Sequence, residues 1–348
     1  MNIPLTVAGL GMVSPLAIGA EANAAAFRCG YDGFQIPRKG KVRYRYAQAP
    51  LDPDIRGLSR LVTLAVPAIA EALEQYEGAL NELPVFFCLA EETRPGCSTA
   101  SGYPQRFIEA LNQEITIDLF HPESSYYNTG RAGFVSALRD AQTLLTKGKP
   151  EFVLILGIDN LTTSSAINHF MGSKKQPCRL LTPDNSDGFI PGEAATALLL
   201  SRTSHSEEQT RITGIGLAKE PAPLESEEVH TSRGLTEAIR KAATQAGTQV
   251  ADTDFVIAGL SGESWFFVEA SNAIHRTMEH TRESHPLWHP ADGMGEVGAA
   301  IGPTLVVMAH YAFMKGYAPG PKALCHLSND DHRRGAFILE HIKGPDHG

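Results

Sequence analysis

The stretch DGFIPGEAA, residues 187–195, runs directly into the hydrophobic segment TALLL, residues 196–200. Gly188 and Gly192 allow backbone conformations with positive φ, and the two acidic side chains of the stretch can accept backbone N–H groups. The residues that follow are apolar and of strand length. This stretch therefore predicts a tight, internally bonded turn that leads into a buried β-strand.

Strand-like and helix-like patterns alternate on both sides of this turn. Before it, strands are expected near residues 5–9, 85–89 and 152–156, with helices near 58–76 and 132–147. After it, the same alternation returns, with strands expected at 195–200, 211–217, 255–258, near 323 and at 336–340, and helices at 234–246 and 298–314. Such alternation is typical of a mixed or parallel sheet covered by helices. We expect two similar halves, residues 1–175 and 176–348, with a polar loop at 174–187 and a surface excursion at 220–231.

Composition excludes several classes of protein. The 348 residues carry 30 Lys and Arg against 39 Asp and Glu, a net charge of −9, which offers no footprint for nucleic acid or anionic membranes. The five cysteines are scattered without metal-ligand spacing, and neither a signal peptide nor a membrane-spanning run is present. We expect a cytoplasmic protein without a metal or other cofactor.

Four segments in chain order resemble the β-ketoacyl synthase family of the thiolase-like superfamily. The turn at 187–195 is similar to the family's DGFxxGEGA, and GAAIG at 298–302 is similar to its GHxxGAAG. The other two are VAGLGMVSPL at 7–16 with RCGYDGF at 28–34, and GLTEAIRKA at 234–242 with DTDFVIA at 252–258. The resemblance implies the family's five-layer αβαβα fold, built from two similar halves.

The same resemblance gives each catalytic group of the family an address in this chain. The family's nucleophilic cysteine falls on Arg131, or on Gly130 if the register slides by one residue. The two catalytic histidines fall on Gly259 and Gly295. Because condensation needs a thiolate and two groups that polarise the substrate, the resemblance implies a site with no catalytic residue.

Other positions suggest what replaced the active site. The family's lysine aligns with Pro290, which follows His289. Asp331 and His332 align with glycines of the family's closing FGFGGTN turn. The Arg131 guanidinium either fills the old acyl pocket, where a cation at a helix N-terminus can bind a carboxylate or phosphate, or turns outward to solvent or a local acid. The candidate ligand pocket therefore comprises Arg131, His289, Phe189, Asp331 and His332.

Two kinds of function remain open at this stage. The first is a non-catalytic adaptor or partner subunit, similar to the chain-length-factor subunits that lack the cysteine and pair with an active ketosynthase. The second is a remodelled pocket, either an acyl-thioester transferase or hydrolase that uses Cys97 or a histidine, or a binder of acyl groups or of an acyl carrier protein. A cysteine in a surface loop is the plainer interpretation of Cys97.

The segment Pro84–Ala90 suggests how the chain associates. It is apolar and uncharged, and in the family the corresponding strand pairs with its copy across a two-fold axis. An exposed edge of this kind invites aggregation unless it is paired. We therefore expect a homodimer with Phe87 at the seam, or a heterodimer with an active ketosynthase, the alternative being a strand buried within one subunit.

Overall fold

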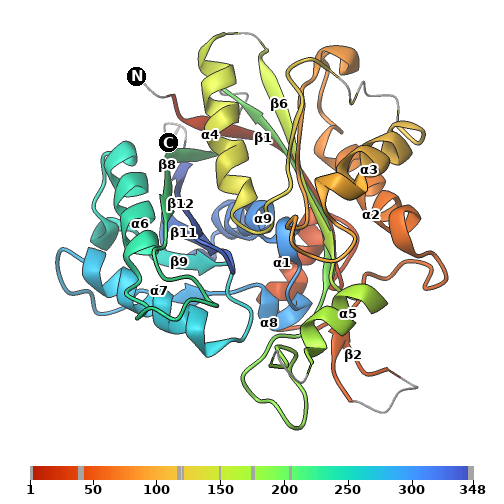
Figure 1. Ribbon diagram of the computed structural model, residues 1–348. Helices are drawn as coiled ribbons and strands as arrows, with labels where there is room; N and C mark the ends of the chain where they lie inside the picture. Colours follow the sequence, from red (N-terminus) through yellow and green to blue (C-terminus); the bar gives the residue numbers. More distant parts are fainter. Residues whose placement is uncertain are drawn as a thin grey trace.

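The computed structural model describes residues 3–37, 43–115, 119, 121–148, 150–173, 177–203 and 206–343. Its main feature is a ten-stranded sheet, in the order β10-β9-β11-β12-β8-β1-β7-β6-β4-β5 (Figure 1). The strands are β1 (Leu5–Val13), β2 (Phe34–Gln35), β3 (Tyr46–Ala47), β4 (Val85–Cys88), β5 (Ser125–Tyr127), β6 (Phe152–Asn160), β7 (Glu193–Ser201), β8 (Gln209–Lys219), β9 (Phe255–Ala258), β10 (Leu287–Trp288), β11 (Lys322–Ser328) and β12 (Arg333–Ile342). The helices are α1 (Ala20–Arg28), α2 (Gly57–Ala72), α3 (Tyr103–Asn112), α4 (Gly133–Thr146), α5 (Ser164–Met171), α6 (Arg233–Ala246), α7 (Ser264–Thr277), α8 (Ala291–Met294) and α9 (Ile301–Met314).

The sheet consists of two five-stranded halves with one plan. In the first half β1 and β6 flank β7 antiparallel, and β4 and β5 continue parallel to β6. In the second half β8 and β11 flank β12 antiparallel, and β9 and β10 continue parallel to β11. The halves meet where β1 pairs with β8 through Leu5 and Thr6. The expected internal repeat is present.

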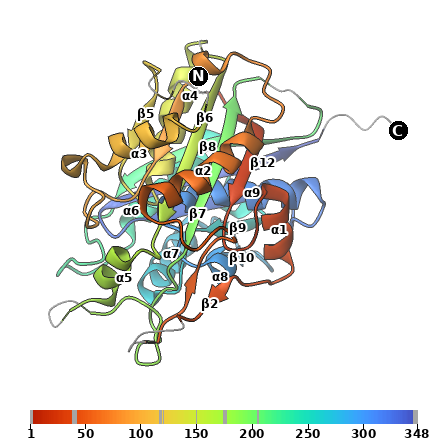
Figure 2. The same ribbon diagram turned by 90° about the vertical axis from the view of Figure 1, so that its right-hand side faces the viewer.

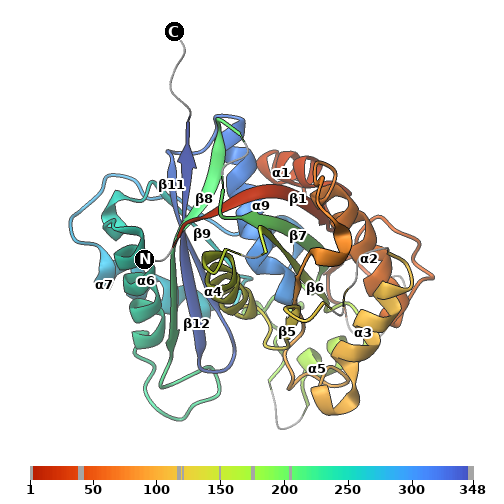
Figure 3. The ribbon, with the colours of Figure 1, turned by 90° about the horizontal axis from the view of Figure 1, so that it is seen from above.

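The helices complete five layers. Viewed from above, α4 and α9 lie between the half-sheets, with α2 and α3 outside the first and α6 and α7 outside the second (Figure 3). One hydrophobic cluster joins α4 and α9 to both half-sheets, and two others lie beneath the outer helices. This is the five-layer α/β fold that the resemblance implied. Among the described helices, none is long and apolar enough to cross a bilayer.

Glycines set the spacing between strands and outer helices identically in both halves. A Cβ atom on Gly9 or Gly11 of β1 would lie 2.0 or 1.9 Å from a carbonyl oxygen of α2. On Gly214 or Gly216 of β8 it would lie 2.0 or 1.9 Å from a carbonyl oxygen of α6. Since no such contact is sterically possible, these glycines let each helix backbone rest directly on its strand.

One expectation about the strands needs correction. The segment Pro84–Ala90 is not an edge, because β4 pairs with β6 on one side and β5 on the other, and residues 85–88 are all buried. The prediction that Phe87 forms a dimer seam is therefore wrong. The edge is β5, whose sequence Ser-Tyr-Tyr is too short and polar to have been recognised. The boundary between residues 175 and 176 stays a prediction. It would place β7 in the second half of the chain, although β7 pairs with β1 and β6 in the first half-sheet.

Smaller elements gather at one end of the molecule. In Figures 1 and 2, α5, α8 and the β2–β3 hairpin lie together below the sheet. The turn at 187–195 also lies in this region, next to the end of α8. There the Gly192 N–H donates to the Glu296 carbonyl, and the Glu296 N–H donates to the Ile190 carbonyl. The loop at 174–187 lies partly outside the described residues. The excursion at 220–231 is present as a loop between β8 and α6.

Candidate functional site

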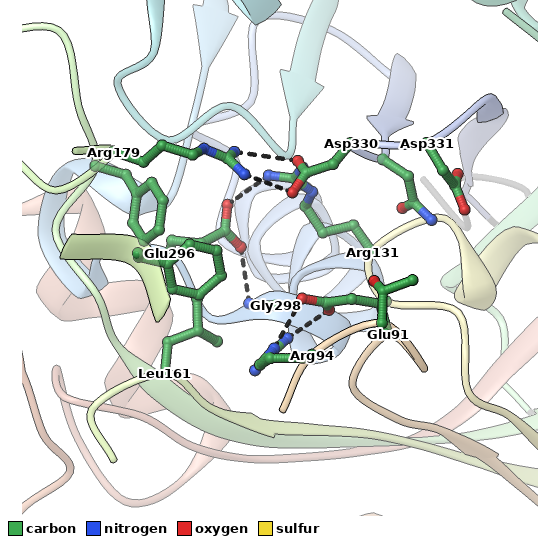
Figure 4. A pocket seen from close by; sticks show the side chains of 14 residues that line it. Glu91, Arg94, Arg131, Leu161, Arg179, Glu296, Gly298, Asp330 and Asp331 are labelled. Atoms are coloured by element: carbon green, nitrogen blue, oxygen red, sulfur yellow. Dashed lines mark hydrogen bonds and ion pairs between the residues drawn. The ribbon is translucent and has the colours of Figure 1, made fainter. Parts of the chain in front are cut away.

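A small cavity lies where β4, β6 and β11 end and α4 begins (Figure 4). Its free volume is ≈ 50 Å³, which admits a few water molecules and no acyl chain. Charged side chains make up half of the residues that line it. The lining residues are Glu91, Thr93, Arg94, Gly130, Arg131, Leu161, Phe170, Arg179, Phe189, Glu296, Gly298, Asn329, Asp330 and Asp331.

Arg131 points into this cavity, just before the first turn of α4. Its Nη1 donates to Glu296 Oε2 at 2.9 Å, and its Nη2 donates to Asp330 Oδ1 at 2.6 Å. The guanidinium also lies 4.7 Å from the centre of the Phe266 ring. Only 8% of the residue is exposed. Of the two orientations of the Arg131 side chain that the sequence left open, the structure has the inward one. The guanidinium is bound by carboxylates of the protein itself.

Asp330 links Arg131 to a second arginine. Arg179 donates to Asp330 Oδ2 at 2.7 Å and holds Glu263 through two hydrogen bonds of 2.7 and 2.8 Å. Burial alone would raise the pKa of the Asp330 carboxyl, but the two guanidiniums hold that pKa well below its ordinary value. Asp330 is therefore ionised at neutral pH and belongs to a charged network.

A second group of ions closes the other side of the cavity. Arg94 bonds both oxygens of Asp159 at 2.7 and 2.8 Å and both oxygens of Glu91. Burial raises the pKa of Asp159 beyond what Arg94 offsets, whereas at Glu91 the guanidinium outweighs burial and lowers the pKa. Three arginines thus face five carboxylates in the two groups together. That excess of negative charge disfavours a carboxylate or phosphate ligand.

A backbone donor at the start of α4 is also occupied. Asn329 Oδ1 accepts the Ala132 N–H at 2.8 Å, and the Asn329 side-chain amide donates back to the Thr129 carbonyl. Buried Arg334 fixes the turn that carries Asn329, since its Nη1 donates to the carbonyls of Asn329 and Asp331 at 2.9 and 2.6 Å. A helix N-terminus is a ready anion site only while its N–H groups are free.

The glycines at the positions where the resemblance implies catalytic groups suit the backbone that holds them. Gly130 and Gly295 have φ values of 70° and 72°, a region that favours glycine. A Cβ on Gly295 would lie 2.5 Å from the Ile190 carbonyl oxygen, and one on Gly259 would lie 2.6 Å from the Leu327 side chain. Side chains at these positions would require the surroundings to move.

The structure brings together some of the predicted pocket residues and separates others. Phe189 and Asp331 line the cavity with Arg131. His289 lies elsewhere, with its Nδ1 2.9 Å from Asp292, and His332 is exposed on the closing turn. The sequence reasoning missed Glu296 as a partner of Arg131 and the pair of Arg179 with Glu263, which shares Asp330 with Arg131. It also missed the ion group of Glu91, Arg94 and Asp159.

Cys97 lies close to the second ion group and is half-buried. Burial raises the pKa of its thiol to about 11, with the carboxylates of Asp159 and Glu91 adding to the effect and Arg94 opposing it. A thiol of this kind is almost wholly protonated at neutral pH and is a weak nucleophile.

Comparison with known proteins agrees with the fold. No protein-family model matches the chain. Over 199 residues it is 27% identical to the "Actinorhodin polyketide putative beta-ketoacyl synthase 2" of Streptomyces coelicolor. That match covers 53% of this chain and 47% of the relative, so the chain spans about half the length of the curated relative it matches.

Solved structures share the fold over almost the entire chain. The ketosynthase complex AntDE:AntF, described with its acyl-carrier protein, has a TM-score of 0.75 at 15% identity, covering 98% of this chain and 100% of that one. The ishigamide ketosynthase/chain length factor has a TM-score of 0.74 at 16% identity, with 98% and 99% covered. The ApeO–ApeC ketosynthase and chain length factor complex of Xenorhabdus doucetiae reaches 0.68 at 16% identity, with 97% and 98% covered. The chain is therefore similar in sequence, over about half its length, to a protein described as a β-ketoacyl synthase, and it shares the ketosynthase fold over almost its entire length.

Proposed function

We propose that the protein is a non-catalytic partner subunit of a ketosynthase-type assembly in the cytoplasm. The observation that carries the proposal is the ion pair of Arg131 with Glu296 and Asp330. It occupies the position where the resemblance puts a nucleophilic cysteine, and it leaves ≈ 50 Å³ of free space. Relatives of the same fold include subunits described as chain length factors.

The chemistry of the cavity supports a binding role over acyl transfer. Arg131 has no nucleophilic atom, and the backbone donor at Ala132 that could stabilise an oxyanion is already bonded to Asn329. The alternative nucleophile, Cys97, carries a thiol whose pKa is raised to about 11, chiefly by burial. An acyl-thioester transferase or hydrolase therefore has little support.

The partner surface that we propose is the free edge of β5. This strand pairs with β4 through Phe86, Phe87 and Cys88, and it ends the described sheet. Ser125 and Tyr126 are exposed there, with 36% of Tyr126 accessible. An unpaired strand edge accepts a strand from another subunit through main-chain hydrogen bonds. A second copy or an active ketosynthase would extend the sheet, and an acyl carrier protein, present in the AntDE:AntF complex, is a further candidate client.

Light scattering on the purified protein, alone and with a ketosynthase from the same source, tests this proposal. We expect a dimer in one of the two samples, and we expect Tyr126→Lys to abolish it because a lysine on the edge opposes strand pairing. Val268→Lys, at a more accessible apolar position on α7, serves as the control and should leave the dimer intact. A monomer in both samples, or a dimer that survives Tyr126→Lys, would count against the β5 edge.

Catalysis is tested separately with malonyl and acyl thioesters of an acyl carrier protein. The wild-type protein should release neither carbon dioxide nor free thiol above the rate without protein. Turnover that Cys97→Ala removes would establish the transferase or hydrolase alternative instead.

A further inference from the structure

The loop between β8 and α6 is bracketed by two titratable side chains that meet a third from α7. Glu220 follows the last residue of β8, His230 precedes α6 by three residues, and Glu269 lies within α7. One ligand atom from each of the three lies within 4.8 Å of the other two. Glu220 and Glu269 are 1% and 0% exposed, and His230 is half-buried. The cluster is separate from the cavity that contains Arg131.

Each of the three side chains is held by an outer hydrogen bond that uses one of its two polar atoms. His230 Nδ1 lies 2.9 Å from the Ala222 carbonyl, which can only accept, so Nδ1 carries the proton and Nε2 carries a lone pair. Glu220 Oε2 accepts the Gly234 N–H at 2.7 Å. Glu269 Oε1 accepts from Arg334 Nε at 2.7 Å. Metal ligands in proteins are oriented by outer partners of these kinds.

The remaining atoms of the three side chains are the ones available to a ligand. Glu269 Oε2 is buried and accepts no hydrogen bond within the described part of the chain. Glu220 Oε1 has a long contact of 3.4 Å with the Ala222 N–H. His230 Nε2 accepts a hydrogen bond of 3.2 Å from the Ser232 hydroxyl, which a bound ion would displace, and it lies 3.7 Å from Glu269 Oε1. A buried acceptor without a donor costs free energy unless something binds to it.

Charge and geometry both favour a cation at this place. Two buried carboxylates face one buried guanidinium, that of Arg334, which leaves one negative charge without a compensating group among these residues. The ring centre of Trp265 lies 4.2 Å from that of His230 and limits the rotation of the imidazole. Ser232, which follows in the chain, is in the left-handed region with φ 55°. Such conformations are retained where the surrounding structure enforces them.

We propose that Glu220, His230 and Glu269 bind a divalent transition-metal ion, with Zn²⁺ as the representative. One imidazole nitrogen with two carboxylate oxygens suits Zn²⁺ and its first-row neighbours better than Mg²⁺ or Ca²⁺, which prefer oxygen ligands throughout. This site goes beyond the proposed partner function and does not depend on it.

The metal would fasten the loop at 220–232 to α7 and to the closing turn of the sheet. The Glu220 N–H already donates to the His332 carbonyl at 2.7 Å, and the Leu224 N–H donates to the Asp330 carbonyl at 3.2 Å. The loop therefore lies against the turn that carries the Arg131 partner Asp330. Its exposed tip includes Val229, which is 84% accessible.

Titration of the chelator-treated full chain with Co²⁺, followed by visible absorption, tests the site directly. We expect one Co²⁺ ion per chain, displaced by Zn²⁺ in calorimetry, and at least tenfold weaker binding by His230→Ala. Glu269→Gln keeps an oxygen for Arg334 while it removes the negative charge, so it should also weaken binding, with the fold checked by circular dichroism. His289→Ala, at a half-buried histidine paired with Asp292 outside the cluster, should bind as the wild type does.

Protease digestion gives a second readout that does not depend on spectra. Zn²⁺ should slow cleavage within residues 221–229 of the wild type several-fold and leave cleavage of His230→Ala unchanged. Failure of the folded wild type to bind one Co²⁺ would overturn the proposal. Equal binding by wild type and His230→Ala would also overturn it.

Discussion

Arg131 and Asp330, which are 199 residues apart in the sequence, are joined by a hydrogen bond of 2.6 Å between Nη2 and Oδ1. The bond ties the start of α4, in the first half of the chain, to the turn between β11 and β12 in the second. Nη1 of the same guanidinium donates to Glu296 Oε2 at 2.9 Å. The candidate site is therefore also a connection between the two halves.

Removal of this guanidinium should destabilise the protein. Arg131→Ala leaves Glu296, which is 4% exposed, without its cation, and stranding a buried charge costs about 3–5 kcal/mol. The free energy of unfolding in urea measures the change. Arg139→Ala, which removes an exposed arginine paired with Asp140 on α4, should cost under about 1 kcal/mol. Similar losses in the two variants would mean that the buried pair contributes little.

Two buried histidines should make stability fall between pH 6.5 and pH 4. Burial lowers the pKa of His326 to about 4, and burial with nearby His341 lowers that of His310 to about 4. The unfolded chain therefore binds more protons than the folded chain in this window, so unfolding becomes easier as the pH drops. Each histidine should contribute about 1.4 kcal/mol for each pH unit.

Chemical unfolding at several pH values measures that slope. His326→Gln should reduce the slope by about 1.4 kcal/mol per pH unit, which corresponds to one bound proton. His275→Gln, at an exposed histidine of α7, should leave the slope unchanged. An unaltered slope in His326→Gln would show that this histidine is not buried in its neutral form.

The glycine contacts of the two halves should be energetically equivalent. Gly11→Ala and Gly216→Ala each place a Cβ atom 1.9 Å from a helix carbonyl oxygen, so strand and helix must separate. We expect each change to cost about 2–3 kcal/mol of unfolding free energy, and the double variant to cost their sum. Ser271→Ala, on the exposed side of α7, is the control and should be neutral. A loss in only one of the two variants would contradict equivalent packing.

The cysteines should differ sharply in reactivity. Burial raises the pKa of Cys97 to about 11, whereas Cys29 is exposed. At pH 8 a disulfide reagent should therefore modify Cys29 at least tenfold faster than Cys97, because the thiolate is the reacting form. Mass spectrometry of timed samples measures both rates, with Cys29→Ser as the control that removes the fast phase. Faster labelling of Cys97 would revive it as a nucleophile.

The sequence predicted the fold because the motifs lie at points where the backbone is tightly constrained. The turn at 187–195 does lead into β7, and Gly9, Gly11, Gly214 and Gly216 occur where strands touch helices. Such constraints are local and leave a pattern of small residues. The position of Arg131 at the start of α4 was predictable for the same reason.

The partners of Arg131 were not predictable, because their contacts are distant in sequence. Glu296 and Asp330 are 165 and 199 residues away, and no local pattern distinguishes them from exposed acids. The prediction of which strand forms the sheet edge was wrong for a different reason. An apolar segment such as Pro84–Ala90 suits the centre of a sheet as well as a paired edge, and only its neighbours decide between them.

The central layer of α4 and α9 has a consequence for how the chain can be divided. Direct pairing of the half-sheets involves only Leu5 and Thr6 with two residues of β8, whereas one shared core encloses both helices. A fragment that ends after β7 would retain α4 but lose the α9 face that covers it. Although the architecture repeats, we expect severed halves to aggregate when expressed alone and to reassemble when expressed together. The duplicated plan therefore yields one indivisible folding unit rather than two independent modules.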